Sequence, residues 1–386
     1  MQFVDLAAQQ DYIRDQVESN IRAVLDHGKY IMGPEVGQFE SLLAEYVGSR
    51  FCVTCSSGTD ALLMALMACG VGSGDAVFTS PFTFIATAEV ISLLGATPVF
   101  VDIDPATYNV DPVKLEFAIQ AVKKNDRGLF SRPGDIPLRP RAIIPVDLFG
   151  LPADYEAINR LGEAHGLVVI EDAAQSLGAS YQNRRAGGLA DMGCTSFFPA
   201  KPLGGYGDGG AVFTDDDRLA QSLQSIRVHG KGEHKYDNAR IGINGRLDTI
   251  QAAVLLAKFD VFPWEIERRQ EVAQRYSEML SPLSSDLRLP MIPENSRSAW
   301  AQYSLLAKNA DHRQSLQDRL KDHGIPSVIY YPKPLHLQSA FASLGYRQGD
   351  MPVSEESAQR IFSLPMHPYL KLEEQEAICA CLAGSS

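Results

Sequence analysis

The sequence has few cysteines and no recognisable metal motif. Six cysteines among 386 residues are too few for a disulfide scaffold at this length. Cys52 and Cys55 form a CxxC motif, but they lie in a strand-like run, where their side chains would point to opposite faces. The eight histidines show no ligand spacing. We therefore expect core cysteines and no metal site.

The sequence also lacks a long apolar run. The longest, Ala61 to Cys69, is too short to cross a bilayer, and no basic region leads into an apolar stretch at the start, as in a signal peptide. The formal net charge of −12 argues against nucleic acid or an anionic membrane as the main partner. We expect a cytoplasmic protein in which local cations hold any anionic substrate.

The order of the apolar patterns indicates two domains, which suits the length of the chain. From Phe51 to Gln224, strand-like runs alternate with helical patterns, which predicts an α/β domain around a mostly parallel sheet. The last third predicts a smaller α+β domain, so we divide the chain into 1–252 and 253–386. We also expect a helical stretch from Asp248 to Leu280 that is interrupted at Pro263 and crosses into the last third, and a strand from Pro326 to Tyr331.

A segment rich in proline and glycine surrounds Lys201. Pro199 and Pro202 flank the lysine and prevent a helix, and five glycines follow, the last being Gly210. The preceding run reads as a buried strand, which places Lys201 on a rigid turn at its end. Most loop lysines are simply solvated, but a lysine used for Schiff-base chemistry must lose its proton, which apolar surroundings favour. The aromatic neighbours that offer such surroundings are Phe197, Phe198 and Tyr206.

Other candidate residues follow the ends of other predicted strands. Ligands of open α/β sheets bind beyond the carboxyl ends of the strands, so we expect these residues to share one site. The candidates at or soon after strand ends are Ser56–Thr59, Phe84, Asp172, Gln175 and Lys201.

Each of these candidates also has a simpler structural interpretation. The helix start at Ser57–Thr59 favours an anion such as phosphate, but Ser57 could serve only as an N-cap. Phe84 could stack on a planar ring or pack in the core. Asp172 could face the pyridine nitrogen of a cofactor or cap a helix. Gln175 could simply be solvated.

As chemistry, the set suits pyridoxal phosphate. The Lys201 amine would form an imine with the aldehyde, and the Asp172 carboxylate would keep the pyridine nitrogen protonated so that the ring accepts electrons. The helix start and the Ser196 hydroxyl would hold the phosphate. Phe84 would stack on the ring, and the Gln175 amide would donate to the ring hydroxyl.

Six segments resemble the sugar aminotransferases of the DegT/DnrJ/StrS family, and the resemblance covers essentially the whole chain. It implies a pyridoxal-phosphate-dependent transferase of fold type I, and a homodimer with active sites at the interface. The segments are Ser57-Gly-Thr-Asp-Ala61, Pro81-Phe-Thr-Phe-Ile-Ala-Thr87, Glu171-Asp-Ala-Ala-Gln175, Ser196-Phe-Phe-Pro-Ala-Lys201, Gly207-Asp-Gly-Gly210 and Asn244-Gly-Arg-Leu-Asp-Thr-Ile-Gln-Ala-Ala253.

The resemblance also assigns roles to residues. Lys201 is implied as the lysine that binds the cofactor, Asp172 as the partner of its pyridine nitrogen, and Gln175 as the partner of its ring hydroxyl. Asn244 would reach the phosphate of the neighbouring subunit's cofactor. The further cofactor contacts would be Ser57, Gly58, Thr59, Phe84 and Ser196.

The segments 28–33, 197–210 and 330–336 look most like the branch of the family that aminates C3 of UDP-2-acetamido-2-deoxy-3-oxo-glucuronate. That resemblance implies L-glutamate as the amino donor and a place in bacterial surface polysaccharide (O-antigen) biosynthesis. Arg246 would pair a substrate carboxylate, since its planar fork suits that geometry; its simpler interpretation is a surface ion pair. The positions that match the nucleotide-sugar contacts are Gly28, Tyr30, Ser56, Arg246, Tyr330, Tyr331 and His336.

Other functions stay open at this point. An aminotransferase for a 4-oxo UDP- or dTDP-sugar has the same fold, and a sugar dehydratase of the family would lack the lysine that Lys201 provides. A non-catalytic regulator with this fold would bind no cofactor and would not turn over glutamate. Two features depart from the branch, namely Tyr330, where a relative carries histidine, and a basic insertion at 123–141, which we expect to form an exposed loop.

Overall fold

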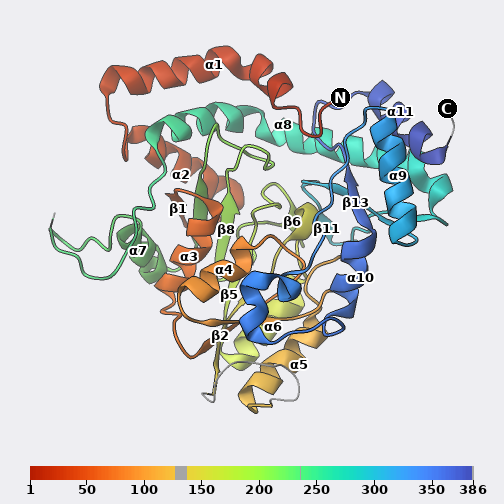
Figure 1. Ribbon diagram of the computed structural model, residues 1–386. Coiled ribbons are helices and arrows are strands. Elements are labelled where there is room, and N and C mark those ends of the chain that lie inside the picture. Colours follow the sequence, from red (N-terminus) through yellow and green to blue (C-terminus); the bar gives the residue numbers. More distant parts are fainter. Residues whose placement is uncertain (127–136, 235, 385–386) are drawn as a thin grey trace.

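A seven-stranded sheet forms the centre of the computed structural model, which describes residues 1–126, 137–234 and 236–384. Its strand order is β1-β9-β8-β5-β4-β2-β3. β9 pairs antiparallel with both of its neighbours, and the remaining pairs are parallel, which confirms the predicted mostly parallel sheet (Figure 1). The strands are β1 (Phe51–Cys55), β2 (Asp75–Thr79), β3 (Thr97–Phe100), β4 (Arg139–Ile144), β5 (Val168–Asp172), β8 (Met192–Ser196) and β9 (Gly210–Thr214).

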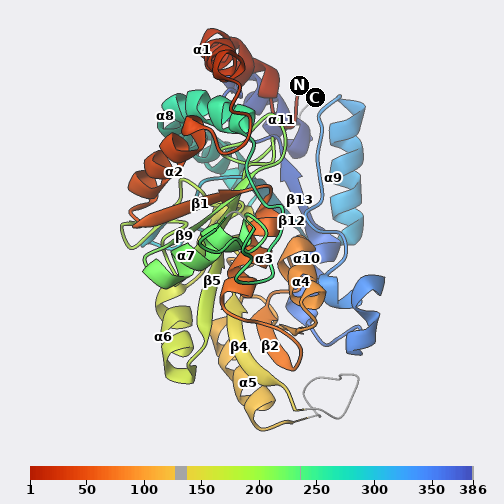
Figure 2. The ribbon, with the colours of Figure 1, turned by 90° about the vertical axis from the view of Figure 1, so that its left-hand side faces the viewer.

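Helices cover both faces of this sheet, which explains why its strands are buried at nearly every position. Helices α3 (Gly58–Ala68), α4 (Ala86–Leu93) and α7 (Asp217–Ile226) contribute to the core on one face. Helices α2 (Pro34–Val47), α5 (Pro112–Lys123), α6 (Tyr155–His165) and the first part of α8 (Thr249–Leu280) contribute to the core on the other, and Figure 2 shows these layers from the side. Cys52 belongs to one core and Cys55 to the other, so both are core cysteines, as predicted.

A smaller unit packs around a three-stranded antiparallel sheet in the order β10-β12-β13. Its core includes residues of α9, α11 and the second part of α8. The prediction of a smaller α+β region is therefore confirmed. Its elements are β10 (Leu287–Arg288), β12 (Tyr303–Ala307), α9 (Ala310–Asp322), α10 (Pro352–Arg360), β13 (Ile361–Leu364) and α11 (Leu372–Ala383).

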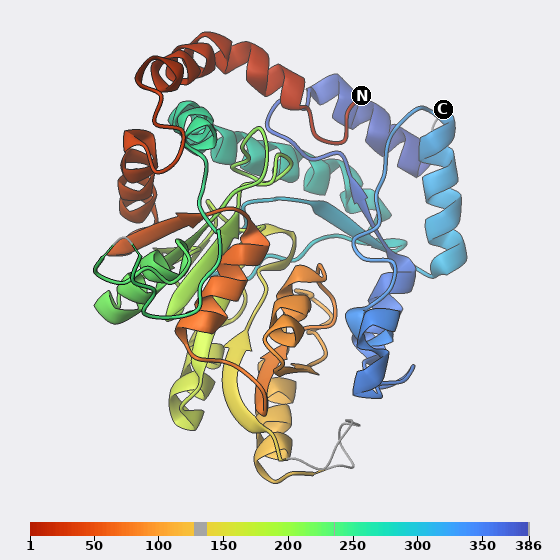
Figure 3. The ribbon, with the colours of Figure 1, turned by 60° about the vertical axis from the view of Figure 1, so that its left-hand side comes forward.

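Helix α8 runs through both units without a break, which corrects the interruption predicted at Pro263. A proline inside a helix removes one hydrogen bond and costs about 3 kcal/mol, but the neighbouring Phe259 and Phe262 are buried in the core and hold the helix in place. The contacts of α8 pass from the first core to the second between Ile266 and Val272. The boundary expected after residue 252 thus falls inside the first turns of this helix. The helix can be followed as one continuous green-to-teal coil in Figure 3.

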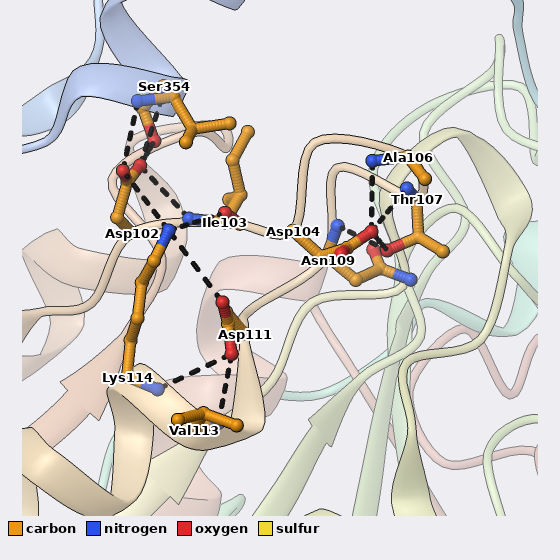
Figure 4. Close-up of polar contacts among 11 residues, drawn as sticks. Asp102, Ile103, Asp104, Ala106, Thr107, Asn109, Asp111, Val113, Lys114 and Ser354 are labelled. Atoms are coloured by element: carbon orange, nitrogen blue, oxygen red, sulfur yellow. Dashed lines mark hydrogen bonds and ion pairs between the residues drawn. The ribbon is translucent and has the colours of Figure 1, made fainter.

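Asp102, just beyond β3, joins the two units at the start of α10 (Figure 4). Its Oδ2 accepts the N–H of Val353 at 3.0 Å, and its Oδ1 accepts the N–H of Ser354 at 2.9 Å and the Ser354 hydroxyl at 2.6 Å. The Lys114 ammonium lies 3.5 Å from Oδ2. A carboxylate of the large unit therefore satisfies N–H groups of the first turn of α10, which have no acceptor within their own helix.

Other predicted elements differ from the structure. The strand expected from Pro326 to Tyr331 reduces to one bridge between Val328 and Ser363. The basic loop expected over 123–141 falls mostly on 127–136, which lie outside the described residues, while Arg139 already belongs to β4 and pairs with Asp75 at 2.7 Å. The remaining elements include α1 (Leu6–His27), β6 (Ser180–Tyr181), β7 (Arg184–Arg185) and β11 (Ser296–Arg297).

None of the helices in the described part of the chain has the length and apolarity needed to cross a membrane.

Candidate active site

A cavity of about 610 Å³ lies where β5 and β8 end and α3 begins. Its position follows the rule that ligands of α/β sheets bind beyond the carboxyl ends of the strands. Most of the predicted cofactor residues meet there, together with two predicted substrate residues. Those that line the cavity are Ser57, Gly58, Thr59, Phe84, Asp172, Gln175, Ser196, Lys201, Tyr330 and Tyr331.

Lys201 stands on a tight turn after β8. Its N–H donates to the carbonyl of Phe198 at 2.8 Å, and the N–H of Gly205 donates to the carbonyl of Phe197 at 2.8 Å. A side chain at Gly204 would come within 2.4 Å of the Pro199 carbonyl oxygen, so only glycine fits there. Burial lowers the pKa of the Lys201 amine, and the nearby Asp172 carboxylate acts in the opposite direction. The lysine is thus held rigidly in surroundings that favour the neutral amine.

Asp172 is the last residue of β5 and is buried. Its Oδ2 accepts the Thr87 hydroxyl at 2.8 Å, and its Oδ1 accepts the N–H of Ala174 at 3.2 Å. Burial raises the pKa of the carboxyl, while these two hydrogen bonds and the charge of Lys201 lower it. The residues after Asp172 form turns and not a helix, so the helix-cap interpretation is wrong.

Gln175 is only 5% exposed, which excludes the solvated interpretation. Its amide oxygen accepts the N–H of Phe149 at 2.8 Å. The amide nitrogen lies 3.4 Å from the Tyr331 hydroxyl. Because the oxygen is occupied by the backbone, the NH₂ group is the part of this side chain that is left to donate toward the cavity.

The start of α3 packs directly against the end of β8. The Ser57 side chain accepts the N–H of Asp60 at 3.0 Å and so caps the helix. A Cβ atom on Gly58 would come within 2.6 Å of the Ser196 Cβ, so the glycine permits this close approach. The first-turn N–H groups of Gly58 and Thr59 have no acceptor within the helix. The N-cap role of Ser57 is therefore compatible with the predicted anion site.

Phe84 is 56% exposed, so it is not a core residue. Its ring centroid lies 6.5 Å from that of Tyr331, and both side chains line the cavity. An exposed aromatic face at the wall of a cavity suits stacking on a planar ring.

The comparisons with known proteins agree with this geometry. The model of the DegT/DnrJ/EryC1/StrS aminotransferase family matches residues 11–383. The chain belongs to this family. It is 47% identical over 384 residues, covering 100% of each chain, to the UDP-2-acetamido-2-deoxy-3-oxo-D-glucuronate aminotransferase of Pseudomonas aeruginosa. Relatives of this kind extend over the full length of the chain.

Solved structures of aminotransferases have the same fold. A DegT/DnrJ/EryC1/StrS aminotransferase from Brucella abortus is 51% identical, with a TM-score of 0.93 over 100% of this chain and 99% of that one. NtdA from Bacillus subtilis, solved with its bound cofactor PMP, is 28% identical, with a TM-score of 0.89 over 100% of this chain and 85% of that one. These likenesses confirm the predicted fold class.

A second group of predicted residues does not line the cavity of this aminotransferase. Ile31 bridges Asp248, the N–H of Thr249 donates to the Tyr30 carbonyl at 3.0 Å, and the N–H of Ser56 donates to the Gly245 carbonyl at 3.1 Å. The Arg246 guanidinium hydrogen-bonds the Asn244 side chain. We call this set the flanking group; its members are Gly28, Tyr30, Ser56, Asn244 and Arg246.

His336 does not line the cavity, and its predicted substrate contact stays a prediction. The side chain is buried, with Nε2 3.0 Å from the Glu355 carboxylate and the ring near that of Tyr346. The N–H of the preceding Leu335 donates to the carbonyl of Pro81 at 2.8 Å, which fixes this segment against the large unit. His336 therefore has a structural partner in this protein.

Some cavity residues were not predicted from the sequence. Thr87, which holds Asp172, lies inside the segment that carried the family resemblance, so its position was a usable signal. Phe3, Val4 and Gln302 also line the cavity, but they arrive from distant parts of the chain and no local pattern marks them. Among the described residues, Lys201 is the only cationic side chain that lines the cavity.

Proposed function

We propose that this aminotransferase uses pyridoxal phosphate to move the amino group of L-glutamate to C3 of UDP-2-acetamido-2-deoxy-3-oxo-glucuronate, for bacterial surface polysaccharide. The observation that carries the proposal is a half-buried lysine with a lowered pKa beside a buried carboxylate in one cavity. The choice of sugar rests on the full-length relative from Pseudomonas aeruginosa, which is named for that substrate.

The residues around the cavity fit this cofactor. The phosphate would take the free N–H groups at the start of α3 and the Ser196 hydroxyl. Asp172 would face the pyridine nitrogen, the Gln175 NH₂ group would donate to the ring hydroxyl, and Phe84 would cover one ring face. When bound, the cofactor supplies an aldehyde for an amine and a ring that accepts electrons from the carbon losing its proton.

Lys201 has two tasks in this proposal. Its amine holds the cofactor between reactions, and once displaced it takes a proton from the amino donor and returns one to the sugar carbon. A base works best when its pKa lies near the operating pH, and burial moves the pKa of this amine downward in that direction. Backbone hydrogen bonds fix the turn that carries Lys201. The amine therefore moves by side-chain rotation between the place where it holds the cofactor and the place where it transfers protons.

The reaction also needs cations that the cavity of one chain does not supply. Glutamate, the sugar carboxylate and the phosphates are all anionic, but Lys201 is the only cation lining the cavity among the described residues. We therefore propose a homodimer in which Arg246 and Asn244 of the flanking group complete the partner's site. Arg246 would pair a substrate carboxylate, since a guanidinium binds carboxylates in a bidentate manner.

The test is mass spectrometry of products after incubation with glutamate and a panel of 3-oxo and 4-oxo UDP- and dTDP-sugars. We expect an amino sugar only from the UDP-linked 3-oxo uronate, and 2-oxoglutarate in equal amount. Amination of a 4-oxo sugar would replace the proposed substrate, and no product from any sugar would favour a non-catalytic regulator. Lys201→Ala is the control and should give no product while remaining folded.

Trapping the cofactor tests the role of the lysine separately. Borohydride reduction of the protein with pyridoxal phosphate, followed by peptide mapping, should label Lys201. A label on another lysine, or none, would refute the assignment even if a sugar amine were formed.

A further inference from the structure

A second, much smaller cavity lies behind Lys201. It measures about 20 Å³ and is bounded by the N-terminal residues before and within α1, the Lys201 turn, α8 and the segment after β13. Lys201 lines both this cavity and the active-site cavity. The lysine turn is therefore the partition between the two, and whatever fills the small cavity supports the turn from behind.

His367 contributes an unpaired acceptor to the small cavity. The residue is 3% exposed, and its Nδ1 is buried with no hydrogen-bond partner. Burial, assisted by the charge of Arg269, lowers the pKa of the imidazole to about 4, and the backbone of Gln2 acts in the opposite direction. At neutral pH the ring is therefore neutral, and one of its two nitrogens keeps a lone pair that can accept a hydrogen bond.

Arg269 contributes an unpaired donor to the same cavity. The residue is 5% exposed, and its Nη1 donates to the carbonyls of Trp300 at 2.9 Å and Met366 at 3.4 Å. Its Nε–H is buried and has no partner. A buried donor without a partner costs about 1–3 kcal/mol, so a group that served both this N–H and the His367 nitrogen would be retained.

The charges around the cavity are of both signs, because Asp5 and Glu265 line it together with Lys201 and Arg269, and they therefore favour a neutral guest. Glu265 also lines it but is already engaged, because its oxygens accept Gln9 Nε2 at 2.8 and 3.0 Å and Oε1 accepts the Tyr369 hydroxyl at 2.7 Å. This carboxylate would repel an anion, and the Arg269 guanidinium would repel a cation. The volume exceeds the roughly 10–15 Å³ that one water molecule needs and leaves no room for a larger ligand.

We propose that Arg269 and His367 hold one ordered water molecule behind Lys201 and that this water positions the lysine turn. The water accepts the Nε–H of Arg269 and donates to Nδ1 of His367. It thereby links α8 to the segment after β13 and fills the space against which the turn that carries the amine packs. His367 and Arg269 act through the water and do not touch the substrate, so they are positioning residues.

A crystal structure at about 1.5 Å resolution tests the site directly. We expect one water peak within about 2.7–3.2 Å of both Arg269 Nε and His367 Nδ1. No peak, or a peak that bonds neither atom, overturns the proposal. This result does not depend on the proposed function, because the small cavity can be seen with or without cofactor and substrate.

Paired variants of His367 test the positioning role, which does rest on the proposed function. His367→Phe removes the acceptor and makes the space behind Lys201 apolar, whereas His367→Gln keeps an amide oxygen that can accept from the water. The readout is the pH midpoint of the absorbance change of bound pyridoxal phosphate. We expect His367→Phe to lower this midpoint by about half a unit or more, because apolar surroundings disfavour the charged amine.

The conservative variant and a remote control complete the test. His367→Gln should keep both the water peak and the wild-type midpoint, and His312→Phe, which changes a half-buried histidine outside the cavity, should leave both unchanged. Equal shifts in the Phe and Gln variants, or a water that persists in His367→Phe, would overturn the positioning role.

Discussion

The hydroxyl of Thr87 donates a hydrogen bond of 2.8 Å to the Oδ2 atom of Asp172. This contact joins the first turn of α4 to the end of β5, and the N–H of Ala174 holds the other carboxylate oxygen. The carboxylate therefore has a fixed orientation before any ligand arrives. Both hydrogen bonds favour the charged form, and so they oppose the effect of burial on the pKa of the carboxyl.

Removing the Thr87 hydroxyl should weaken cofactor binding. Thr87→Val keeps the shape of the side chain but leaves one oxygen of the buried carboxylate unpaired, so its pKa should rise further. A hydrogen bond to a charged group contributes about 1.5–3 kcal/mol, so we expect the Kd for pyridoxal phosphate to rise about 10- to 100-fold in an absorbance titration. Thr87→Ser should restore most of the affinity; wild-type affinity in Thr87→Val would show that the contact does not matter.

A methyl group at Gly58 should disturb both the fold and the phosphate site. Its Cβ would lie 2.6 Å from the Ser196 Cβ, so the start of α3 must move away from β8, at a cost of about 1–3 kcal/mol. We expect Gly58→Ala to lower the free energy of unfolding in urea and to weaken phosphate binding. Gly37→Ala is the matched control, because Gly37 lies in helix α2 with nothing within 4 Å of the new atom. This control should stabilise the protein by about 0.5–1 kcal/mol; a similar gain for Gly58→Ala would contradict the packing argument.

Asp102 should contribute more to stability than an exposed helix cap does. Asp102→Ala leaves the N–H groups of Val353 and Ser354 without acceptors, and unsatisfied buried groups cost about 1–3 kcal/mol each. We expect a clear fall in Tm by calorimetry. Asp111→Ala removes the N-cap of α5 within the large unit and should cost only about 1 kcal/mol. Equal losses in the two variants would mean that the contact between the units adds nothing.

Lys258 should make stability depend on pH in the alkaline range. The side chain is 1% exposed, its Nζ lies 4.5 Å from the centre of the Tyr206 ring, and burial lowers its pKa to about 8 against the opposing charge of Glu265. Above pH 8 the folded protein loses this proton while the unfolded chain keeps it up to the ordinary lysine value. The free energy of unfolding should therefore rise with pH across that window.

Urea unfolding of the apoprotein at several pH values between 7.5 and 10 measures this effect. Lys258→Met lacks the titrating amine, so the stability of the wild type relative to the variant should increase over the range. A difference that stays constant with pH would show that the folded-state pKa is close to normal.

The sequence was sufficient for those site residues whose position depends on local order. Lys201, Asp172 and Gln175 follow strands, and the ends of neighbouring parallel strands meet at one edge of a sheet, so their convergence was predictable. The continuity of α8 was not predictable, because the proline penalty is local while the packing of Phe259 and Phe262 that outweighs it is tertiary. His336 matched a sequence motif, but its side chain is bound to Glu355 in the interior. This contact is tertiary as well, so the local sequence did not reveal it. His367 and Arg269 lie 98 residues apart (367 − 269), and no pattern in the sequence links them.

Helix α8 packs in the hydrophobic cores of both units. Neither unit can move relative to the other unless this helix bends or its hydrogen bonds break, so access to Lys201 cannot depend on a hinge between the units. Unfolding of either core would remove half of the packing that stabilises the helix. Heating should therefore melt the whole molecule in one cooperative step.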